Sequence, residues 1–270
     1  SKKLINFCSN DYLNIASHPQ IKRAFIDGIN KYGFGSSSSN LISGYYHSHR
    51  ALEEKFAEFL QRDKALLFNS GYHANLGVIT TLTNRNSTII ADRLCHASII
   101  DSILLSQANH LRYKHNDLAD ATRLLAQQNK IQKKFLITEG VFSMEGDITP
   151  LNEFANLAKK NNTTTIVDDA HSIGVLGKNG EGTCEHFNLN QTDIACLITP
   201  LGKALGGVGA IVSGSHEFIE TLIQFARTYA YTTALPPAIS YAELAALEII
   251  NKSSDLKSDI QKLEDSDYDN

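Results

Sequence analysis

The sequence lacks the features that mark membrane, secreted and nucleic-acid-binding proteins. No apolar run in the 270 residues approaches the ~20 residues that a membrane-spanning helix requires, and the first six residues contain no apolar region of a signal peptide. The net charge of −4 gives no basic field to attract nucleic acid or an anionic membrane. The four cysteines form no C-x-x-C pair, which predicts reduced thiols. We therefore expect a soluble, cytoplasmic protein.

Motifs for two common kinds of enzyme are also missing. No H-E-x-x-H pair is present, so no metal site is expected. Gly202-Lys203-Ala204 lacks the upstream glycine and the hydroxyl of a nucleotide-binding phosphate loop, and no G-x-G-x-x-G occurs. A metal-dependent or nucleotide-binding enzyme therefore has no support in the sequence.

Short β-rich runs alternate with helical patterns along the chain. The runs fall at residues 64–68, 88–91, 135–138, 164–167, 195–198 and 209–212. This alternation predicts an α/β fold with a mostly parallel sheet that helices cover on both faces. In such sheets, ligands bind beyond the carboxyl ends of the strands.

Two helices are predicted in detail. Apolar residues recur at helical spacing over residues 52–60, which places Glu53, Glu54 and Glu58 on the exposed face. Thr149–Pro150 provides a capping hydroxyl followed by a proline suited to the first helical position.

Three polar clusters follow predicted strands. Asp168, Asp169 and His171 come at the end of a buried run, and Lys203 lies in a glycine-rich turn after another. Residues 69–75 form a strand-to-helix junction, where free N–H groups suit one phosphate. Each cluster alone also fits an ordinary turn, helix cap or surface lysine.

Taken together, the clusters indicate a single ligand. It would carry a phosphate, a carbonyl for the Lys203 amine and a ring nitrogen for Asp168. Pyridoxal phosphate (PLP) has these three groups, and its protonated ring stabilises negative charge on a substrate carbon. Burial would lower the pKa of Lys203 and so favour the neutral amine that acts as a nucleophile.

At these residues the sequence resembles the α-oxoamine synthases, which are PLP enzymes of fold type I. The similar segments occur in family order at residues 8–13, 70–75, 91–98, 115–117, 138–147, 167–171, 202–203 and 232–237. The resemblance implies the large domain of the PLP-dependent transferase fold, in a homodimer. We expect an N-terminal segment at residues 1–35, the PLP-binding domain at 36–250, and the start of a linker or a frayed tail at 251–270.

The resemblance also implies residue roles at the reacting centre. Lys203 would form the Schiff base with PLP and later remove the substrate Cα proton, and Asp168 would pair with the pyridine nitrogen. His171 and Ser143 would reach the ring hydroxyl oxygen, and His96 would stack on the ring as a second catalytic residue.

The phosphate would be held by another set of residues. Ser70, Gly71 and Tyr72 would hold it largely through the backbone. By the same resemblance, Thr232 and Thr233 would reach the phosphate of the neighbouring subunit, so that each active site would be composite.

The reaction that the resemblance favours belongs to biotin biosynthesis. L-Alanine and a pimeloyl thioester of coenzyme A or a carrier protein would condense, releasing carbon dioxide and a thiol. The alternatives are a glycine-using 2-amino-3-ketobutyrate ligase or another α-oxoamine synthase, and, in another class, a catalytically incomplete PLP-binding partner subunit.

Three departures from the family pattern affect these expectations. Pro200 stands where the family has a phosphate-binding threonine, with Thr199 one place early, and Leu41 replaces a histidine. The family's C-terminal domain, which supplies an arginine for the substrate carboxylate, has no counterpart here. We therefore expect the chain as given to bind PLP but to turn over poorly.

Overall fold

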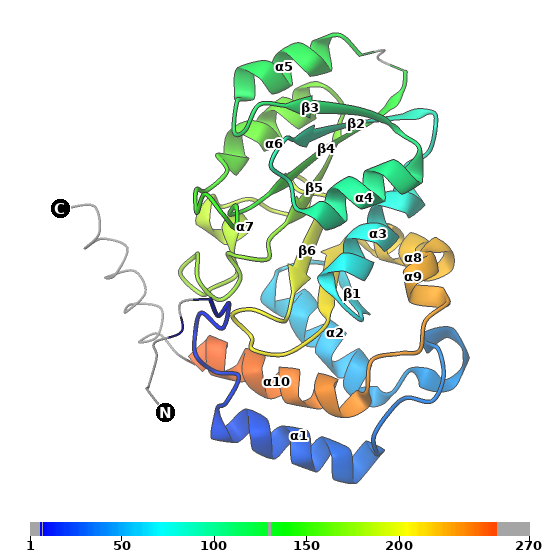
Figure 1. Ribbon diagram of the computed structural model, residues 1–270, viewed down its shortest axis with the longest axis vertical. Helices are drawn as coiled ribbons and strands as arrows, with labels where there is room; N and C mark the ends of the chain where they lie inside the picture. The colour runs from blue at the N-terminus through cyan, green and yellow to red at the C-terminus, as the bar shows by residue number, and fades with distance from the viewer. Residues whose placement is uncertain (1–5, 7, 129–130, 253–270) are drawn as a thin grey trace, which may run out of the picture.

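The computed structural model describes Asn6, residues 8–128 and residues 131–252 (Figure 1). The tail predicted at residues 251–270 lies outside the described residues from residue 253 onward. No helix in the described part of the chain is long and apolar enough to cross a membrane.

A seven-stranded sheet forms the centre of the molecule, in the order β1-β7-β6-β5-β4-β2-β3 (Figure 1). The strands are β1 (Lys64–Phe68), β2 (Ser87–Asp92), β3 (Asn109–Tyr113), β4 (Lys133–Glu139), β5 (Thr164–Asp168), β6 (Cys196–Pro200) and β7 (Ala210–Gly214). Strand β7 pairs antiparallel with both of its neighbours, and the other pairs are parallel. The predicted α/β class with a mostly parallel sheet is confirmed.

Helices cover both faces of the sheet. They are α1 (Pro19–Tyr32), η1 (Asn40–Gly44), α2 (His47–Phe59), α3 (Gly71–Leu82), α4 (Ala97–Ser106), α5 (Leu118–Ala126), α6 (Leu151–Lys160), α7 (Thr183–His186), α8 (His216–Phe225), α9 (Arg227–Ala230) and α10 (Pro237–Lys252). Buried side chains of α2, α5, α6 and α10 pack on one face, and those of α3, α4, α8 and α9 pack on the other. Successive strand residues point to opposite faces, so each strand contributes to both cores.

The six predicted strands are all present, and one further strand was not predicted. Strand β3 lies at the edge of the sheet and carries polar residues such as Asn109 and Arg112. Because an edge strand is partly exposed to solvent, its residues need not all be apolar. The sequence therefore contains no apolar run that would predict β3.

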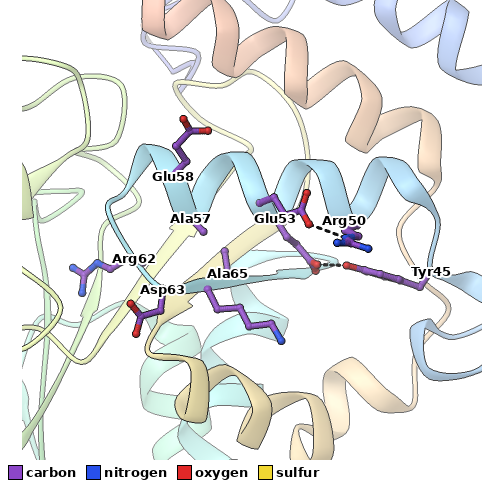
Figure 2. Close-up of a pocket in the computed structure, with 10 residues that line it drawn as sticks. Tyr45, Arg50, Glu53, Ala57, Glu58, Arg62, Asp63 and Ala65 are labelled. Atoms are coloured by element: carbon purple, nitrogen blue, oxygen red, sulfur yellow. Dashed lines mark hydrogen bonds and ion pairs between the residues drawn. The ribbon is translucent and has the colours of Figure 1, made fainter.

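The prediction that Glu53 lies on the exposed face of its helix is wrong. Glu53 is 8% exposed. Its carboxylate accepts a hydrogen bond from the Tyr45 hydroxyl at 2.5 Å (Figure 2) and one from the Leu67 N–H at 2.9 Å. Strand β1 is at the edge of the sheet, so the outward N–H of Leu67 has no strand partner. The carboxylate of Glu53 satisfies this buried donor, which explains a glutamate in the core.

Glu53 also borders a charged cavity of about 580 Å³ between α2 and β1 (Figure 2). Arg50, Glu54, Arg62 and Lys64 are among the residues that line it. None of the predicted site residues lines this cavity, so it is separate from the site described below.

Replacing Glu53 with glutamine is expected to remove a pH-dependent part of the free energy of unfolding. Burial raises the pKa of Glu53 to about 7, although the bonds from Tyr45 and Leu67 oppose the shift. The folded protein therefore binds this proton more tightly than the unfolded chain, and the stabilisation is present at low pH and lost as the pH rises through 7. Between pH 5 and pH 8, wild type should lose on the order of 2 kcal/mol relative to Glu53→Gln.

Urea unfolding of both proteins at the two pH values measures this difference. Glu54→Gln, which changes an exposed neighbour on the same helix, is the matched control. If the free energy of unfolding changed equally with pH in wild type and in Glu53→Gln, Glu53 would already be ionised in the folded protein at pH 5.

The predicted cap of the sixth helix is wrong by one residue. Helix α6 begins at Leu151, and Pro150 occupies the N-cap position without a side-chain bond. The Thr149 hydroxyl instead donates to the Glu139 carbonyl at 2.7 Å and to Asn116 Oδ1 at 3.2 Å. Glu139 ends β4 and Asn116 lies in the loop after β3, so Thr149 links the two at the carboxyl edge of the sheet.

Candidate active site

The three polar clusters predicted from the sequence meet at one edge of the sheet. Asp168 is the last residue of β5, and Lys203 follows the end of β6 by three residues. Ser70 caps α3 just after β1. Strand β1 runs in the same direction as β5 and β6, because β7 lies between β1 and β6 and is antiparallel to both. The shared direction places all three clusters at the carboxyl ends of the strands.

Lys203 and His171 form the centre of this site. The Lys203 Nζ lies 2.7 Å from His171 Nε2, and both side chains are half-buried. Burial lowers the pKa of Lys203, and the carboxylates of Asp168 and Glu139 partly oppose the shift. Burial, followed by the nearby Lys203 charge, lowers the pKa of His171 to about 4. The imidazole is therefore neutral at physiological pH.

Asp168 is buried and held in place by two donors. The Asn75 amide donates to its Oδ2 at 2.7 Å, and the Ala170 N–H donates to its Oδ1 at 3.2 Å. Burial raises the pKa of Asp168, against the effects of Asn75 and the Lys203 charge. Asn75 also donates to Ser98 Oγ at 3.0 Å, so that one amide links this carboxylate to helix α4.

Asp169 has a different environment from its neighbour. Its carboxylate accepts the Thr183 hydroxyl at 2.5 Å and the Thr183 N–H at 3.0 Å, and the residue is 0% exposed. Asp169 therefore anchors the short helix α7 to the end of β5, while the Asp168 carboxylate contacts α3.

The first turn of α3 provides an anion-binding geometry. The Ser70 hydroxyl accepts the His73 N–H at 3.2 Å, and within the described residues no protein acceptor meets the N–H of Gly71 or Tyr72. A Cβ on Gly71 would come within 2.8 Å of Pro200 Cγ, so this close approach requires glycine. The Tyr72 hydroxyl points elsewhere, donating to Asp101 at 2.9 Å.

Thr199 does not take the place of the threonine that Pro200 replaces. Its hydroxyl is buried and has no partner among the described residues. Because alternate strand residues face opposite ways, Thr199 points away from the face on which Pro200 meets Gly71.

Thr232 and Thr233 lie close to the same helix start within the chain. The Asn69 amide donates to the Thr233 carbonyl at 2.8 Å and to Thr232 Oγ1 at 3.4 Å. Asn69 directly precedes the cap Ser70, so these contacts bring the threonines near the predicted phosphate site.

His96 and Ser143 also lie at this edge of the sheet. His96 caps α4, where its Nδ1 accepts the Ser98 N–H at 3.2 Å, and its exposed ring is free for stacking. Ser143 lines a cavity of about 290 Å³ together with Tyr12, Phe142 and His171. The structure thus brings Ser143 and His171 onto one cavity.

Three residues of the site were missed in the sequence analysis. Asn75 holds Asp168, and the Tyr12 hydroxyl lies 2.6 Å from His171 Nδ1. Glu139 accepts the His96 N–H at 2.5 Å, and burial, reinforced by the Asp168 carboxylate, raises its pKa to about 8. All three lie inside quoted motifs, but only the fold shows which groups they contact.

The His115-Asn116-Asp117 motif supports the site from outside. His115 bonds Asp92 at 3.1 Å and Asp147 at 2.9 Å through its two ring nitrogens, and Asn116 donates to the same Asp147 oxygen at 2.7 Å. Asp147 closes the turn that carries Ser143. This motif therefore fixes a loop of the site and does not reach Lys203 through any of these bonds.

The chain belongs to a family of PLP-dependent enzymes. The family model for aminotransferase class I and II matches residues 2–269. This membership confirms the predicted cofactor, pyridoxal phosphate, and the predicted fold type.

Curated relatives show which members of this family the chain is similar to. The chain is 48% identical over 248 residues to the 8-amino-7-oxononanoate synthase of Methylococcus capsulatus, covering 92% of this chain and 64% of the relative. It is 45% identical over 262 residues to that of Thioalkalivibrio sulfidiphilus, covering 97% and 67%. The chain thus spans about two thirds of the length of these curated relatives. The expected resemblance to the α-oxoamine synthases is confirmed.

Solved structures agree with the sequence relatives. Serine palmitoyltransferase of Sphingomonas wittichii matches with a TM-score of 0.91 at 31% identity, covering 94% of this chain and 63% of that one. An 8-amino-7-oxononanoate synthase from Francisella tularensis matches with a TM-score of 0.86 at 42% identity, covering 97% and 73%.

Proposed function

We propose that this chain catalyses the decarboxylative condensation of L-alanine with a pimeloyl thioester, giving 8-amino-7-oxononanoate, carbon dioxide and free thiol, at the low rate expected from its sequence. The observation that carries the proposal is the half-buried Lys203 amine, 2.7 Å from a neutral His171 and beside the buried Asp168 carboxylate. The identity of 44–48% to curated synthases of this reaction supports the choice of substrates.

The residues of the cluster fit PLP. When bound, PLP supplies an electron sink for negative charge at the substrate Cα. Lys203 would bind its carbonyl carbon and, once released, would hold and return the Cα proton. Its pKa, lowered by burial, favours the neutral amine that both tasks need. Asp168, fixed by Asn75 and Ala170, would keep the pyridine nitrogen protonated.

The remaining predicted residues would orient the cofactor. His171 and Ser143 would reach the ring oxygen, with His171 Nε2 shared between that oxygen and the Lys203 amine, and His96 would cover one face of the ring. The N-terminal turn of α3 at Ser70, Gly71 and Tyr72 would hold the phosphate. Pro200 offers no hydroxyl there, so the contact would depend on backbone N–H groups and the helix dipole.

We also propose that the active unit is a cytoplasmic homodimer whose PLP-binding domain comprises residues 36–250, with residues 1–35 as an N-terminal segment. Phe34, Ile42 and Tyr231 are 95%, 81% and 76% exposed. The segments that carry them meet where Ser39 pairs with Thr233. An apolar surface beside the predicted phosphate site is suited to a second copy of the chain.

Mixing two inactive variants tests the composite site. Neither Lys203→Ala nor Thr233→Val should be active alone, because each lacks one half of every site. A mixed dimer contains one site with both residues intact, so up to about a quarter of the wild-type rate should return. Size-exclusion chromatography with light scattering measures the dimer directly. A monomer that binds PLP and reacts with substrate would contradict the proposal.

Substrate selection is tested by measuring thiol release. The PLP-loaded chain receives L-alanine or glycine with pimeloyl or acetyl thioesters, each on coenzyme A and on a carrier protein. The proposed function predicts release that requires L-alanine and a pimeloyl group, with one carbon dioxide for each thiol. Faster turnover of glycine with the acetyl thioester would favour the 2-amino-3-ketobutyrate ligase reaction. PLP binding without thiol release would leave the chain a cofactor-binding partner and contradict the proposed function.

A further inference from the structure

A continuous hydrogen-bonded chain leads from Lys203 to the surface of the molecule. His171 Nε2 lies 2.7 Å from Lys203 Nζ, and His171 Nδ1 lies 2.6 Å from the Tyr12 hydroxyl. Both ring nitrogens thus have a partner that can donate or accept. Tyr12 is 39% exposed, so its hydroxyl connects the half-buried amine with solvent.

We propose that Tyr12 is a positioning and proton-transfer residue, which acts through His171 to carry protons between Lys203 and water. This inference rests on the proposed function and adds to it a route for the proton that Lys203 takes from the substrate. Tyr12 lies far from the other site residues in the sequence, and its place next to His171 is visible only in the fold.

The turn that carries Tyr12 is rigidly placed. The Asp11 carboxylate accepts the N–H groups of Ile15 at 2.9 Å and Ala16 at 3.2 Å, and Leu13 and Ile15 are buried at 6% and 2% exposure. The hydroxyl therefore sits on a closed turn that is anchored in the core by two buried residues just after Tyr12.

The same turn packs directly on the loop that carries Lys203. Gly206 has a φ of +70°, and a Cβ there would come within 2.6 Å of Ala16 Cα. The Gly206 N–H donates to the Lys203 carbonyl at 2.8 Å. Tyr12 and Lys203 are thus held on two turns in backbone contact, which keeps the chain through His171 at hydrogen-bonding distance.

Two proton arrangements satisfy the chain, and one shift interconverts them. In the first, the Lys203 ammonium donates to Nε2, and Nδ1–H donates to the Tyr12 oxygen. In the second, Tyr12 donates to Nδ1, and Nε2–H donates to the neutral amine. Moving from the first to the second transfers one proton along each bond, and the Tyr12 hydroxyl releases its own proton to water. The net change is one proton lost by Lys203 and gained by water.

The imidazole stays neutral in both arrangements. This agrees with the environment of His171, where burial disfavours the imidazolium. The charged or titratable groups near it are Lys203 and His96, with Asp168 and Glu139 acting on the lysine. Asp168 and Glu139 accept other bonds, from Asn75 and the His96 N–H, and neither interrupts the path to Tyr12.

The first test needs no cofactor. In the unloaded protein, ¹⁵N NMR of the His171 side chain should show the proton moving from Nδ1 to Nε2 as Lys203 titrates. Tyr12→Phe keeps the ring and removes the hydroxyl, so the Nδ1 shift should no longer follow the lysine. Tyr241→Phe, which changes a hydroxyl on α10 beside Tyr32, is the matched control and should behave as wild type.

The second test uses the PLP-loaded chain and L-alanine alone. Exchange of the alanine Cα proton with solvent deuterium should slow about tenfold or more in Tyr12→Phe, because one proton-transfer group is lost. PLP affinity and thermal unfolding should change little. A purely structural role would instead lower both and leave the His171 titration coupled to Lys203.

The outcomes separate this inference from the proposed function. Equal His171 titration and equal exchange rates in wild type and Tyr12→Phe would overturn the role of Tyr12. If wild type exchanges the alanine proton but releases no thiol from a pimeloyl thioester, the proposed condensation fails while the relay stands. If wild type exchanges nothing, the NMR titration still decides whether Tyr12 and Lys203 are linked through His171.

Discussion

Lys203→Ala is expected to abolish covalent attachment of PLP and to slow substrate turnover on the order of 10³-fold or more. The amine is the group in this cluster that can both bond a carbonyl carbon and move a proton, and its lowered pKa favours both. The vacated space beside His171 should still admit the cofactor. The variant should therefore bind PLP reversibly, with the absorbance of the free aldehyde in place of that of a Schiff base.

Absorbance spectra before and after dialysis measure this difference. Lys22→Ala is a suitable control. Lys22 of α1 lines a cavity together with Gly206, which belongs to the loop that carries Lys203, and His171 is not among the residues of that cavity. Retention of PLP by Lys203→Ala through dialysis, with normal turnover, would assign the chemistry to another amine.

Replacing the two adjacent aspartates with asparagine is expected to give opposite results. Asp168→Asn should still fold and bind PLP, although its single amide oxygen can accept only one of the two bonds that Asn75 and the Ala170 N–H donate to different oxygens of Asp168. The asparagine could no longer keep the pyridine nitrogen of PLP protonated. Each unit by which the pKa of that nitrogen falls weakens the electron sink by ~1.4 kcal/mol. Exchange of the substrate Cα proton with deuterium should fall on the order of 100-fold.

Asp169→Asn should instead reduce stability. Its carboxylate accepts both the hydroxyl and the N–H of Thr183 in a fully buried position. Losing one charge-assisted bond there costs about 1.5–3 kcal/mol in the free energy of unfolding, while exchange in the folded fraction should persist. Urea unfolding and deuterium exchange on both variants give the comparison. Loss of exchange in Asp169→Asn with normal exchange in Asp168→Asn would reverse the assignment.

The sheet could be predicted from the sequence because its strands are apolar. Residues 64–68 match β1 from end to end, and 164–167 fall one residue short of β5. The edge strand β3 could not be predicted, since its polar residues meet solvent. The reversed direction of β7 has no local signal either, because strand direction depends on which neighbour the chain pairs with.

Burial of charged groups was the main source of error. Helical spacing assigns Glu53 to the exposed face. Its carboxylate is buried instead, because it accepts the Leu67 N–H, which has no partner strand at the edge of the sheet. Such a donor is visible only when the strand order is known. The role of Tyr12 could not be predicted for the same reason. Tyr12 and His171 are 159 residues apart in the sequence, and only the fold brings them into hydrogen-bond contact.

The positions of Asp168, His171 and Lys203 could be predicted because Asp168 ends one strand of a mostly parallel sheet and the other two residues come shortly after strand ends. The parallel arrangement brings the strand ends together whatever their distance in sequence. The donors that hold Asp168, which are the Asn75 amide and the Ala170 N–H, could not be predicted. Hydrogen-bond partners depend on side-chain directions, which spacing along one chain does not determine.

The most direct test of the central claim, that Lys203 is the residue that binds PLP, is covalent mapping. The chain is incubated with PLP, reduced with borohydride, digested and examined by mass spectrometry. Our account predicts one pyridoxyl group, on Lys203. When L-alanine saturates the protein before reduction, the peptide that contains Lys203 should carry none. A pyridoxyl group on a different lysine, or none in a protein that has bound PLP, would contradict it.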